Sequence, residues 1–254
     1  WGPSSLAPRP SASLRLARPP ADNGHPALSV STCTASGCTA EAKKVALDSN
    51  WLWVHKTGTY KPNCFDNNTW NSAICADPAT CAAACGLDAA ESDYPATYGI
   101  TAAGDALSLQ FKVGSNVGSR TYLMDNTTSY TMFKLKNKEF TFDVELSTMP
   151  CGFNAAFYFV GMTANEGEAE NGTRYCDAQA VSDYFCAEMD VMEANTVAQQ
   201  YTTHACVDAC ASYNEAAPQC KGVFGVPSNV CDQNGCGLNP FRYGPGTTYN
   251  SEQN

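Results

Sequence analysis

Basic residues and long apolar runs are scarce in this sequence. Its 254 residues include 15 Lys and Arg against 25 Asp and Glu, a formal charge of −10. Basic stretches interleaved with aromatic residues are missing, which argues against a nucleic-acid partner. No apolar run approaches the roughly 20 residues of a membrane-spanning helix, so we expect no membrane partner. A neutral polymer or small sugar fits this composition better than a polyanion.

Metal-binding patterns are equally rare. The three histidines, His25, His55 and His204, lie far apart in the sequence, and no two cysteines form a Cys-x-x-Cys pair. A structural zinc site needs such pairs or clusters. We therefore expect no metal site.

Cysteine, in contrast, is abundant. The chain has 14 cysteines at irregular short spacings among Asn, Thr, Gly and Pro. This pattern is typical of a disulfide framework formed in an oxidising compartment, so we expect a secreted, extracellular protein. Sequons at Asn67, Asn126 and Asn171 are consistent with a glycoprotein on that route.

The first 30 residues differ from the rest. They are rich in Pro, Ser and Ala, and they lack the apolar core of a secretion signal. We interpret residues 1–30 as a disordered segment, a linker or a non-native N-terminal segment. The rest, residues 31–254, is expected to be one domain.

Apolar residues recur at every second position between about residues 96 and 162, notably in 107–113 and 140–146. This period is typical of half-buried antiparallel strands, separated here by turns at 114–116 and 136–138. The run 153–160 alternates less cleanly, as a central strand covered on both faces would. The expected fold class is all-β: an antiparallel β-sandwich of the concanavalin-like jelly-roll type, rich in disulfides and with few short helices.

One short helix is predicted. Asp77 suits the N-cap position, Pro78 the first turn, and Gly86 the position that ends the helix.

Residues 188–193 read Glu-Met-Asp-Val-Met-Glu, with three carboxylates in six positions. In a regular strand Glu188 and Asp190 share a face and Glu193 points to the other. One bulged residue around Val191–Met192 restores the parity and brings all three to one face, and bulges are common beside active sites. Two glutamates roughly 5–5.5 Å apart across a scissile bond are what a retaining glycosidase needs.

The plainer interpretation of this hexapeptide is a solvated acidic strand edge. Its apolar neighbours Met189, Val191 and Met192 argue against full exposure. A shielded carboxylate cluster is costly unless it has a function.

Five sequence blocks together resemble the glycoside hydrolase family 7 cellulases, which comprise cellobiohydrolases and endoglucanases. The hexapeptide alone is less specific, because a related jelly-roll family of β-glucanases also has it. The resemblance runs from about residue 33 to residue 249. The blocks are LDSNWLWVH (47–55), NCFDNNTW (63–70), CGFNAAFYFV (151–160), YCDAQ (175–179) and EMDVMEAN (188–195), the last followed by THAC (203–206).

The resemblance implies roles for the carboxylates. Glu188 is expected to be the nucleophile, Glu193 the general acid/base, and Asp190 the residue that positions and tunes the nucleophile. The implied reaction is retaining hydrolysis of β-1,4 bonds in cellulose or a related β-glucan by a monomer, and no metal or organic cofactor enters it.

Further positions match those that line the family's substrate groove. Trp51 and Trp53 suit stacking on glucose rings, although two tryptophans on one face of a core strand are an equal alternative. His204 lies where the family places a histidine near the acid/base residue, and we expect it to bias that carboxyl's protonation. The other substrate-binding candidates are Arg120, Asn154, Tyr158, Asp177, Gln179 and Arg242.

The resemblance also implies six disulfides and two unpaired cysteines, Cys151 and Cys236. The implied pairs are Cys33–Cys38, Cys64–Cys85, Cys75–Cys81, Cys176–Cys186, Cys206–Cys231 and Cys210–Cys220.

Two features depart from the family pattern. Only five residues separate Gln179 from Phe185, where the family has a long excursion, and the family's domain continues beyond the matched region. We therefore expect an incomplete catalytic domain, C-terminally truncated and with an internal deletion. Two alternatives stay open: a catalytically inactive, lectin-like β-glucan-binding protein, and a jelly-roll endo-β-1,3(4)-glucanase. Endo or processive exo action, and glucan or xylan as substrate, are also left open.

Overall fold

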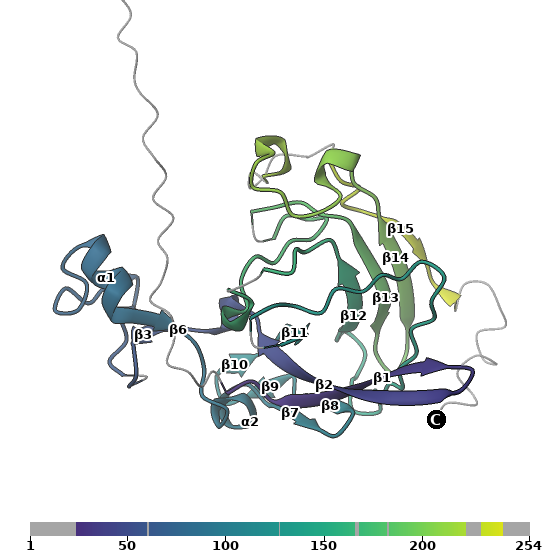
Figure 1. Cartoon of the computed structure of the whole chain (residues 1–254), viewed down its shortest axis with the longest axis horizontal. Helices are drawn as coiled ribbons and strands as arrows, with labels where there is room; N and C mark the ends of the chain where they lie inside the picture. Colours follow the sequence, from purple (N-terminus) through teal and green to yellow (C-terminus); the bar gives the residue numbers. More distant parts are fainter. Residues whose placement is uncertain are drawn as a thin grey trace, which may run out of the picture. The chain divides into compact units, whose positions relative to one another are not determined.

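The computed structural model describes residues 24–59, 61–126, 128–165, 168–181, 183–221 and 230–240 (Figure 1). The chain divides into two compact units. The first extends to residue 127 and includes Glu170–Gly172, and the second contains the remaining residues. Strands outnumber helices in the order of elements, as the sequence predicts. No helix in the described ranges is long and apolar enough to cross a membrane.

The main sheet of the first unit is antiparallel, with the order β1-β2-β11. The hairpin of β1 (Ala27–Thr34) and β2 (Gly37–Leu47) is closed by a disulfide between the opposed Cys33 and Cys38. The end of β2 pairs with β11 (Thr121–Met124). Residues 27–30, which sequence analysis places in the N-terminal segment, therefore belong to β1, whereas residues 1–23 lie outside the described residues.

Four short antiparallel ladders accompany this sheet. They are β3 (Val54–Lys56) with β6 (Cys85–Leu87), β4 (Phe65–Asp66) with β5 (Thr69–Trp70), β7 (Ile100–Ala103) with β8 (Ala106–Leu109), and β9 (Lys112–Val113) with β10 (Asn116–Val117). The helical elements are η1 (Ser49–Trp51), α1 (Pro78–Ala84), α2 (Asp93–Thr97) and η2 (Ala169–Asn171), of which η2 begins in the second unit.

Helix α1 begins as predicted. Asp77 is its N-cap, and the side chain accepts a hydrogen bond from the Thr80 backbone N–H. Its end differs from the prediction, because Cys85 is already extended and Gly86 pairs with His55 in the β3–β6 ladder. Gly86 is thus a strand residue and not the left-handed residue that ends the helix.

The core of the first unit forms where β2 ends. Leu47, Ala89, Tyr94, Tyr98 and Ile100 make up a buried cluster, against which the side chains of 51–53 pack. The Tyr94 hydroxyl accepts a hydrogen bond from the Leu47 backbone N–H, which satisfies a polar group at the centre of this cluster.

The period-two segment 107–113 folds differently from the prediction. It forms β8, then β9, and the predicted turn joins β9 to β10 with Gly114 at a positive φ of 57°. The expected half-burial is not found, because Leu107, Leu109 and Phe111 are exposed.

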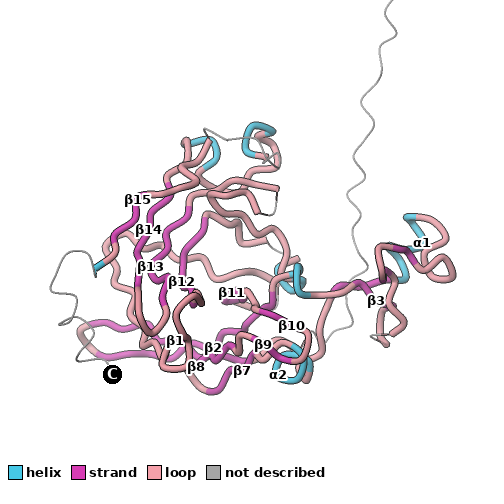
Figure 2. The backbone as a smooth tube through the Cα atoms, turned by 180° about the vertical axis from the view of Figure 1, so that it is seen from behind, coloured by secondary structure: helices cyan, strands magenta, loops and turns pink. Residues whose placement is uncertain are grey.

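The second unit contains one antiparallel sheet, with the order β12-β13-β14-β15 (Figures 1 and 2). Its strands are β12 (Ala155–Val160), β13 (Glu188–Ala194), β14 (Gln199–His204) and β15 (Cys236–Leu238). Two short helical turns, η3 (Asp208–Cys210) and η4 (Pro218–Cys220), are joined by the Cys210–Cys220 disulfide.

Two strand predictions in this unit need correction. Residues 140–146 form no strand, although Phe140 and Phe142 stack on Phe157 with ring centroids 5.3 and 4.4 Å apart. A strand is defined by a hydrogen-bonded partner, and no described residue pairs with this segment. For the same reason β12 lies at an edge of its described sheet and is not the central strand that its composition suggests.

All six disulfides implied by the resemblance are present, and Cys151 and Cys236 are free and exposed. Many of the elements contain only two to four residues, too few to be stable alone. The cross-links therefore support structure that a larger apolar core would otherwise hold.

Gly172 tests how closely the segments of the first unit are packed. Its φ is +60°, and an added Cβ would lie 1.8 Å from the Leu47 carbonyl oxygen. We expect Gly172→Ala to destabilise the protein by several kcal/mol, because the backbone itself must move. Gly104 has a similar φ of +62° and nothing within 4 Å. Gly104→Ala should therefore cost only the conformational term, about 1–2 kcal/mol. Urea unfolding of the two variants measures the difference, and equal losses would contradict the close approach.

Candidate active site

A β-bulge in β13 determines how its carboxylates are arranged. On one side, Asp190 pairs with Thr202 and Glu193 with Gln200, so that three steps along β13 match two along β14. On the other side, Tyr158 pairs with Asp190 and Phe157 with Met192, which again leaves one extra residue in β13. The bulge predicted at Val191–Met192 is confirmed.

The bulge places the three carboxylates on one face of the sheet. The residues of β14 opposite Glu188, Asp190 and Glu193 are His204, Thr202 and Gln200, which follow each other at intervals of two. Cross-strand partners share a face, so the three acidic residues do too. Because β13 lies between β12 and β14, the solvated strand edge is ruled out as the explanation of the hexapeptide.

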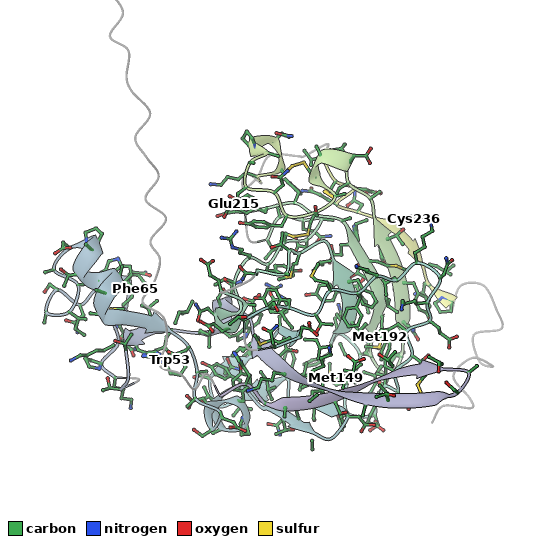
Figure 3. The ribbon with its side chains drawn as sticks, viewed as in Figure 1. Trp53, Phe65, Met149, Met192, Glu215 and Cys236 are labelled. Carbon is green, nitrogen blue, oxygen red and sulfur yellow. A yellow bond between two sulfur atoms is a disulfide. The ribbon has the colours of Figure 1, made fainter. Side chains whose placement is uncertain are left out.

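The opposite face of the sheet is apolar. Met189 pairs with Phe159 and Met192 with Phe157, and Figure 3 labels Met192 on its strand. The rings of Phe133, Phe140 and Phe142 lie against these two phenylalanines. The bulge therefore separates a polar face from an aromatic one.

A chain of hydrogen bonds links His204, Asp190 and Glu188. His204 Nε2 lies 3.1 Å from Asp190 Oδ2, and Asp190 is hydrogen-bonded to Glu188. His204 Nδ1 is 2.8 Å from the Asp232 carbonyl oxygen. A carbonyl only accepts, so Nδ1 carries a proton and Nε2 bears a second one only in the imidazolium form.

Burial governs the protonation of this chain. It raises the pKa of Glu188 to about 7, and the charge of Asp190 adds to the rise. Burial and the charge of Glu193 also raise the pKa of Asp190, whereas His204 opposes that rise. For His204, burial acts against the charged form, but the Asp232 carbonyl and the two carboxylates raise its pKa overall. Near neutral pH the three groups therefore share protons and are not all deprotonated.

The loop after Cys176 supplies a further contact to Glu188. The Ala178 backbone N–H donates a hydrogen bond of 3.2 Å to Glu188 Oε2. Asp177 shapes this loop, because its Oδ1 accepts hydrogen bonds from the backbone N–H groups of Gln179 and Val181. The Cys176–Cys186 disulfide closes the loop onto the start of β13.

Two residues that were predicted to contact substrate make hydrogen bonds within this loop or beside it. Asp177 is only 3% exposed and holds the loop in place, and its contact with substrate stays a prediction. Gln179 is exposed, but its side-chain amide donates a hydrogen bond to the Gln233 carbonyl. The sequence shows two polar residues, Asp177 and Gln179, at this place, but it does not show which of the two side chains is buried.

Two other predicted residues lie on the carboxylate face. The side-chain amide of Asn154, just before β12, donates a 2.9 Å hydrogen bond to Glu193 Oε1. Tyr158 is the cross-strand partner of Asp190, and its hydroxyl accepts a 3.3 Å hydrogen bond from Tyr175. Asn154 therefore orients the expected acid/base residue, and Tyr158 lies beside Asp190, the residue expected to position the nucleophile.

Sequence analysis missed Gln200 and Thr202. Both lie on the carboxylate face opposite Glu193 and Asp190, and Gln200 donates a side-chain hydrogen bond to Thr202. Gln200, Thr202 and His204 are two positions apart, as residues on one face of a strand are, and this spacing could have identified Gln200 and Thr202 from the sequence.

Trp51, Trp53 and Arg120 belong to the first unit. The Arg120 guanidinium lies 5.8 Å from the Trp51 ring centre, and the Trp51 indole donates a hydrogen bond to the Val117 carbonyl. Trp53 packs at 6.1 Å against Tyr98. Trp51 ends η1 and Trp53 precedes β3, so the two do not share the face of one strand.

Arg120 is anchored to a buried carboxylate. Its Nε and Nη2 atoms lie 2.9 and 2.8 Å from Asp48 Oδ2, which also accepts a hydrogen bond from the Tyr122 hydroxyl. Arg120 therefore supports the Trp51 ring, in addition to the substrate contact expected of it. The ninth candidate, Arg242, lies outside the described residues.

One side-chain set on the carboxylate face has the chemistry of a cation site. The nearest ligand atoms of Glu188, Asp190 and His204 lie within 4.8 Å of one another. His204 Nε2 and Asp190 Oδ2 are already hydrogen-bonded to each other, and Glu188 Oε2 accepts from the Ala178 N–H. A second set, Cys64, Cys75 and Cys85, consists of disulfide-bonded cysteines and offers no thiolates.

The sheet and its paired carboxylates define the class: an all-β protein with the side chains of a carboxylate-dependent glycosidase. Residues 20–185 and 182–254 match the model of Glycosyl hydrolase family 7, so the chain belongs to that family. The two matched segments meet at 182–185, in the loop that sequence analysis identified as shortened. Family 7 membership decides against the jelly-roll endo-β-1,3(4)-glucanase family.

Solved structures agree with this assignment. A family 7 cellobiohydrolase from Daphnia pulex is 35% identical with a TM-score of 0.68, over 89% of this chain and 62% of that chain. The cellobiohydrolase from Melanocarpus albomyces, complexed with cellotetraose, gives 35% and 0.68 over 87% and 60%. The Humicola insolens endocellulase EGI gives 33% and 0.66 over 86% and 59%. These matches confirm the β-sandwich class, and the chain spans about 60% of the length of these relatives.

Asp48 offers a test of the support beneath Trp51. Asp48→Ala removes the fully buried partner of Arg120 and Tyr122, and we expect a loss of about 3–5 kcal/mol in the free energy of unfolding. Asp125→Ala is the control, because it removes a carboxylate that pairs with Lys43 at the surface. It should cost about 1 kcal/mol or less. If urea titrations give similar losses for both variants, the support is not established.

The raised pKa of Glu188 predicts a pH-dependent stability. The folded protein holds a proton that the unfolded chain releases, so this stabilisation is complete below pH 4.5 and is lost as the pH rises through about 7. Glu188→Gln should flatten that part of the profile, measured as the free energy of unfolding against pH. Glu139→Gln, at an exposed position, should keep the wild-type slope. An unchanged slope in Glu188→Gln would contradict the assignment.

Proposed function

We propose that this chain is a glycosidase that hydrolyses β-1,4 bonds of cellulose or a related β-glucan and retains the configuration at the anomeric carbon. The observation that carries the proposal is the bulge in β13, which brings Glu188 and Glu193 to one face with Asp190 between them. A retaining glycosidase needs two carboxyl groups on a common substrate. Membership of family 7 supports the same reaction and substrate class.

In the first step Glu193 gives its proton to the leaving glycosidic oxygen, while Glu188 attacks the anomeric carbon. The bond to the leaving oxygen breaks and a glycosyl-enzyme ester forms at Glu188. Asn154 holds the Glu193 carboxyl in place through its amide hydrogen bond. In the second step Glu193 takes a proton from water, whose oxygen displaces Glu188 and restores both carboxyls.

The nucleophile attacks as a carboxylate, and two groups favour that form. The Ala178 N–H donates a hydrogen bond to Glu188 Oε2, and the charge of His204, when it is an imidazolium, lowers the pKa of Glu188. Both groups oppose the burial that raises this pKa. The imidazolium Nε2–H also donates to Asp190 Oδ2, which favours the ionised form of Asp190.

We further propose that the protein acts outside the cell, as a monomeric glycoprotein. Six disulfides support an oxidising compartment, and the sequons support glycosylation.

Activity tests the assignment of the two glutamates. Glu188→Gln should abolish reducing-sugar release from soluble β-glucan, because no carboxylate remains to form the ester. Glu193→Gln should lower the rate by about 10²–10⁴-fold. On an aryl glycoside whose leaving group needs no proton, Glu193→Gln should still release a burst of phenol. Proton NMR of the first product should show the β-anomer.

The control is Glu139→Gln, an exposed position whose side chain contacts Thr141. It should retain wild-type activity. Hydrolysis by Glu188→Gln at the wild-type rate would refute the proposed mechanism. Binding of β-glucan without any release of sugar by the unsubstituted chain would favour the lectin-like alternative.

A further inference from the structure

The β4–β5 hairpin carries an exposed aromatic pair. Phe65 and Trp70 are cross-strand partners, with ring centroids 4.9 Å apart and planes inclined at 57°. Trp70 is 51% exposed and Phe65 37% exposed. Figure 3 labels Phe65 on this hairpin. Large aromatic rings left open to solvent next to each other commonly mark a binding surface.

Polar side chains surround a hollow beside Trp70. The hollow is shallow and wide open to solvent, and its lining consists of Lys61, Pro62, Asn63, Asp66, Thr69, Trp70 and Asn71. Within the described chain, the side chains of Lys61, Asn63 and Asp66 make no hydrogen bond or ion pair. They therefore offer donors and acceptors to a ligand at the rim of an aromatic surface.

The backbone beneath the hollow is held firmly. The Cys64 N–H donates to the Val54 carbonyl and the Asn71 N–H to the Cys64 carbonyl, both at 2.8 Å. The Cys64–Cys85 disulfide ties the hairpin to β6. A platform of this kind loses little conformational entropy when a ligand binds.

The chemistry of the hollow selects its ligand. One cation, Lys61, and one anion, Asp66, balance each other at the rim, which disfavours a strongly charged polymer. A sugar ring presents apolar C–H groups on its faces and hydroxyls around its edge. An open indole face with amide, carboxylate and ammonium groups beside it matches both features.

We propose that the β4–β5 hairpin is a second carbohydrate-binding site, which stacks a glucose unit of a β-glucan chain on Trp70. It shares no residue with the carboxylate face. The identity of the glucan rests on the proposed function, whereas the aromatic and polar groups of the site do not.

Binding is best measured in a Glu188→Gln background, which does not consume the glucan. Asn67→Gln should be added, because Asn67 heads a sequon in the turn between β4 and β5. In this parent, Trp70→Ala should weaken binding to soluble β-glucan, measured by affinity electrophoresis, by about tenfold, as expected for a central aromatic anchor. Trp70→Phe keeps a ring and should retain most of the affinity, and Asn63→Ala should weaken binding through the polar rim.

Phe111→Ala is the matched control, because it removes an exposed aromatic residue of the same unit outside the hollow. It should bind like the parent. Labelling with 5-fluorotryptophan gives a direct readout that does not depend on a destabilising variant. The Trp70 resonance, assigned through Trp70→Phe, should shift when cellohexaose is added.

An unshifted Trp70 resonance together with parental binding by Trp70→Ala would overturn the second site. The outcome is independent of catalysis. A chain that releases sugar while its Trp70 resonance stays unshifted refutes the second site and leaves the proposed function intact. If the Trp70 resonance shifts but the chain never releases sugar, the second site is supported and the proposed function is refuted.

Discussion

The bulge at Val191–Met192 is the constraint on which the candidate site depends. An unbulged β13 would turn Glu193 towards the face that carries Phe157 and Phe159. A carboxylate among aromatic rings without a partner costs several kcal/mol, so such a strand would be unstable as well as inactive. The bulge also keeps Met189 and Met192 on the apolar face. One extra residue thus satisfies the packing of one side of the sheet and the chemistry of the other.

Burial on the polar face makes it costly for the carboxyl groups of Glu188 and Asp190 to ionise together, and His204 reduces this cost through its hydrogen bond to Asp190. Glu188 and Asp190 lie too close together, and too far from water, for both to ionise readily. His204 can neutralise one charge only because the Asp232 carbonyl fixes which of its nitrogens faces Asp190. The Asp232 carbonyl, which lies well beyond β13 in the sequence, therefore helps to determine how many protons His204, Asp190 and Glu188 hold.

The sequence was sufficient to predict features that depend on spacing along one strand. Three carboxylates at 188, 190 and 193 require a bulge if they are to act together, and the register contains it. Cysteine pairing followed from the family blocks. Features that depend on a partner elsewhere were not predictable. Residues 140–146 have the period of a strand, yet no ladder forms without a pairing segment. Asp177 and Ala178 show the same limit. The Asp177 carboxylate accepts from a backbone N–H and the Ala178 backbone N–H donates to Glu188, and contacts of backbone groups leave no pattern in the sequence.

Disulfides hold several short segments of this chain in position. The Cys176–Cys186 disulfide joins positions ten apart in the sequence, and the loop inside it holds the Ala178 N–H against Glu188. A loop this short loses little entropy when its ends meet, so the amide is positioned at low cost. The Cys64–Cys85 disulfide does the same for the two-residue strands β4 and β5. In both places a cross-link holds the group that our proposals use, the Ala178 N–H beside Glu188 and the Trp70 ring on its hairpin, because the surrounding core is too small to fix it by packing alone.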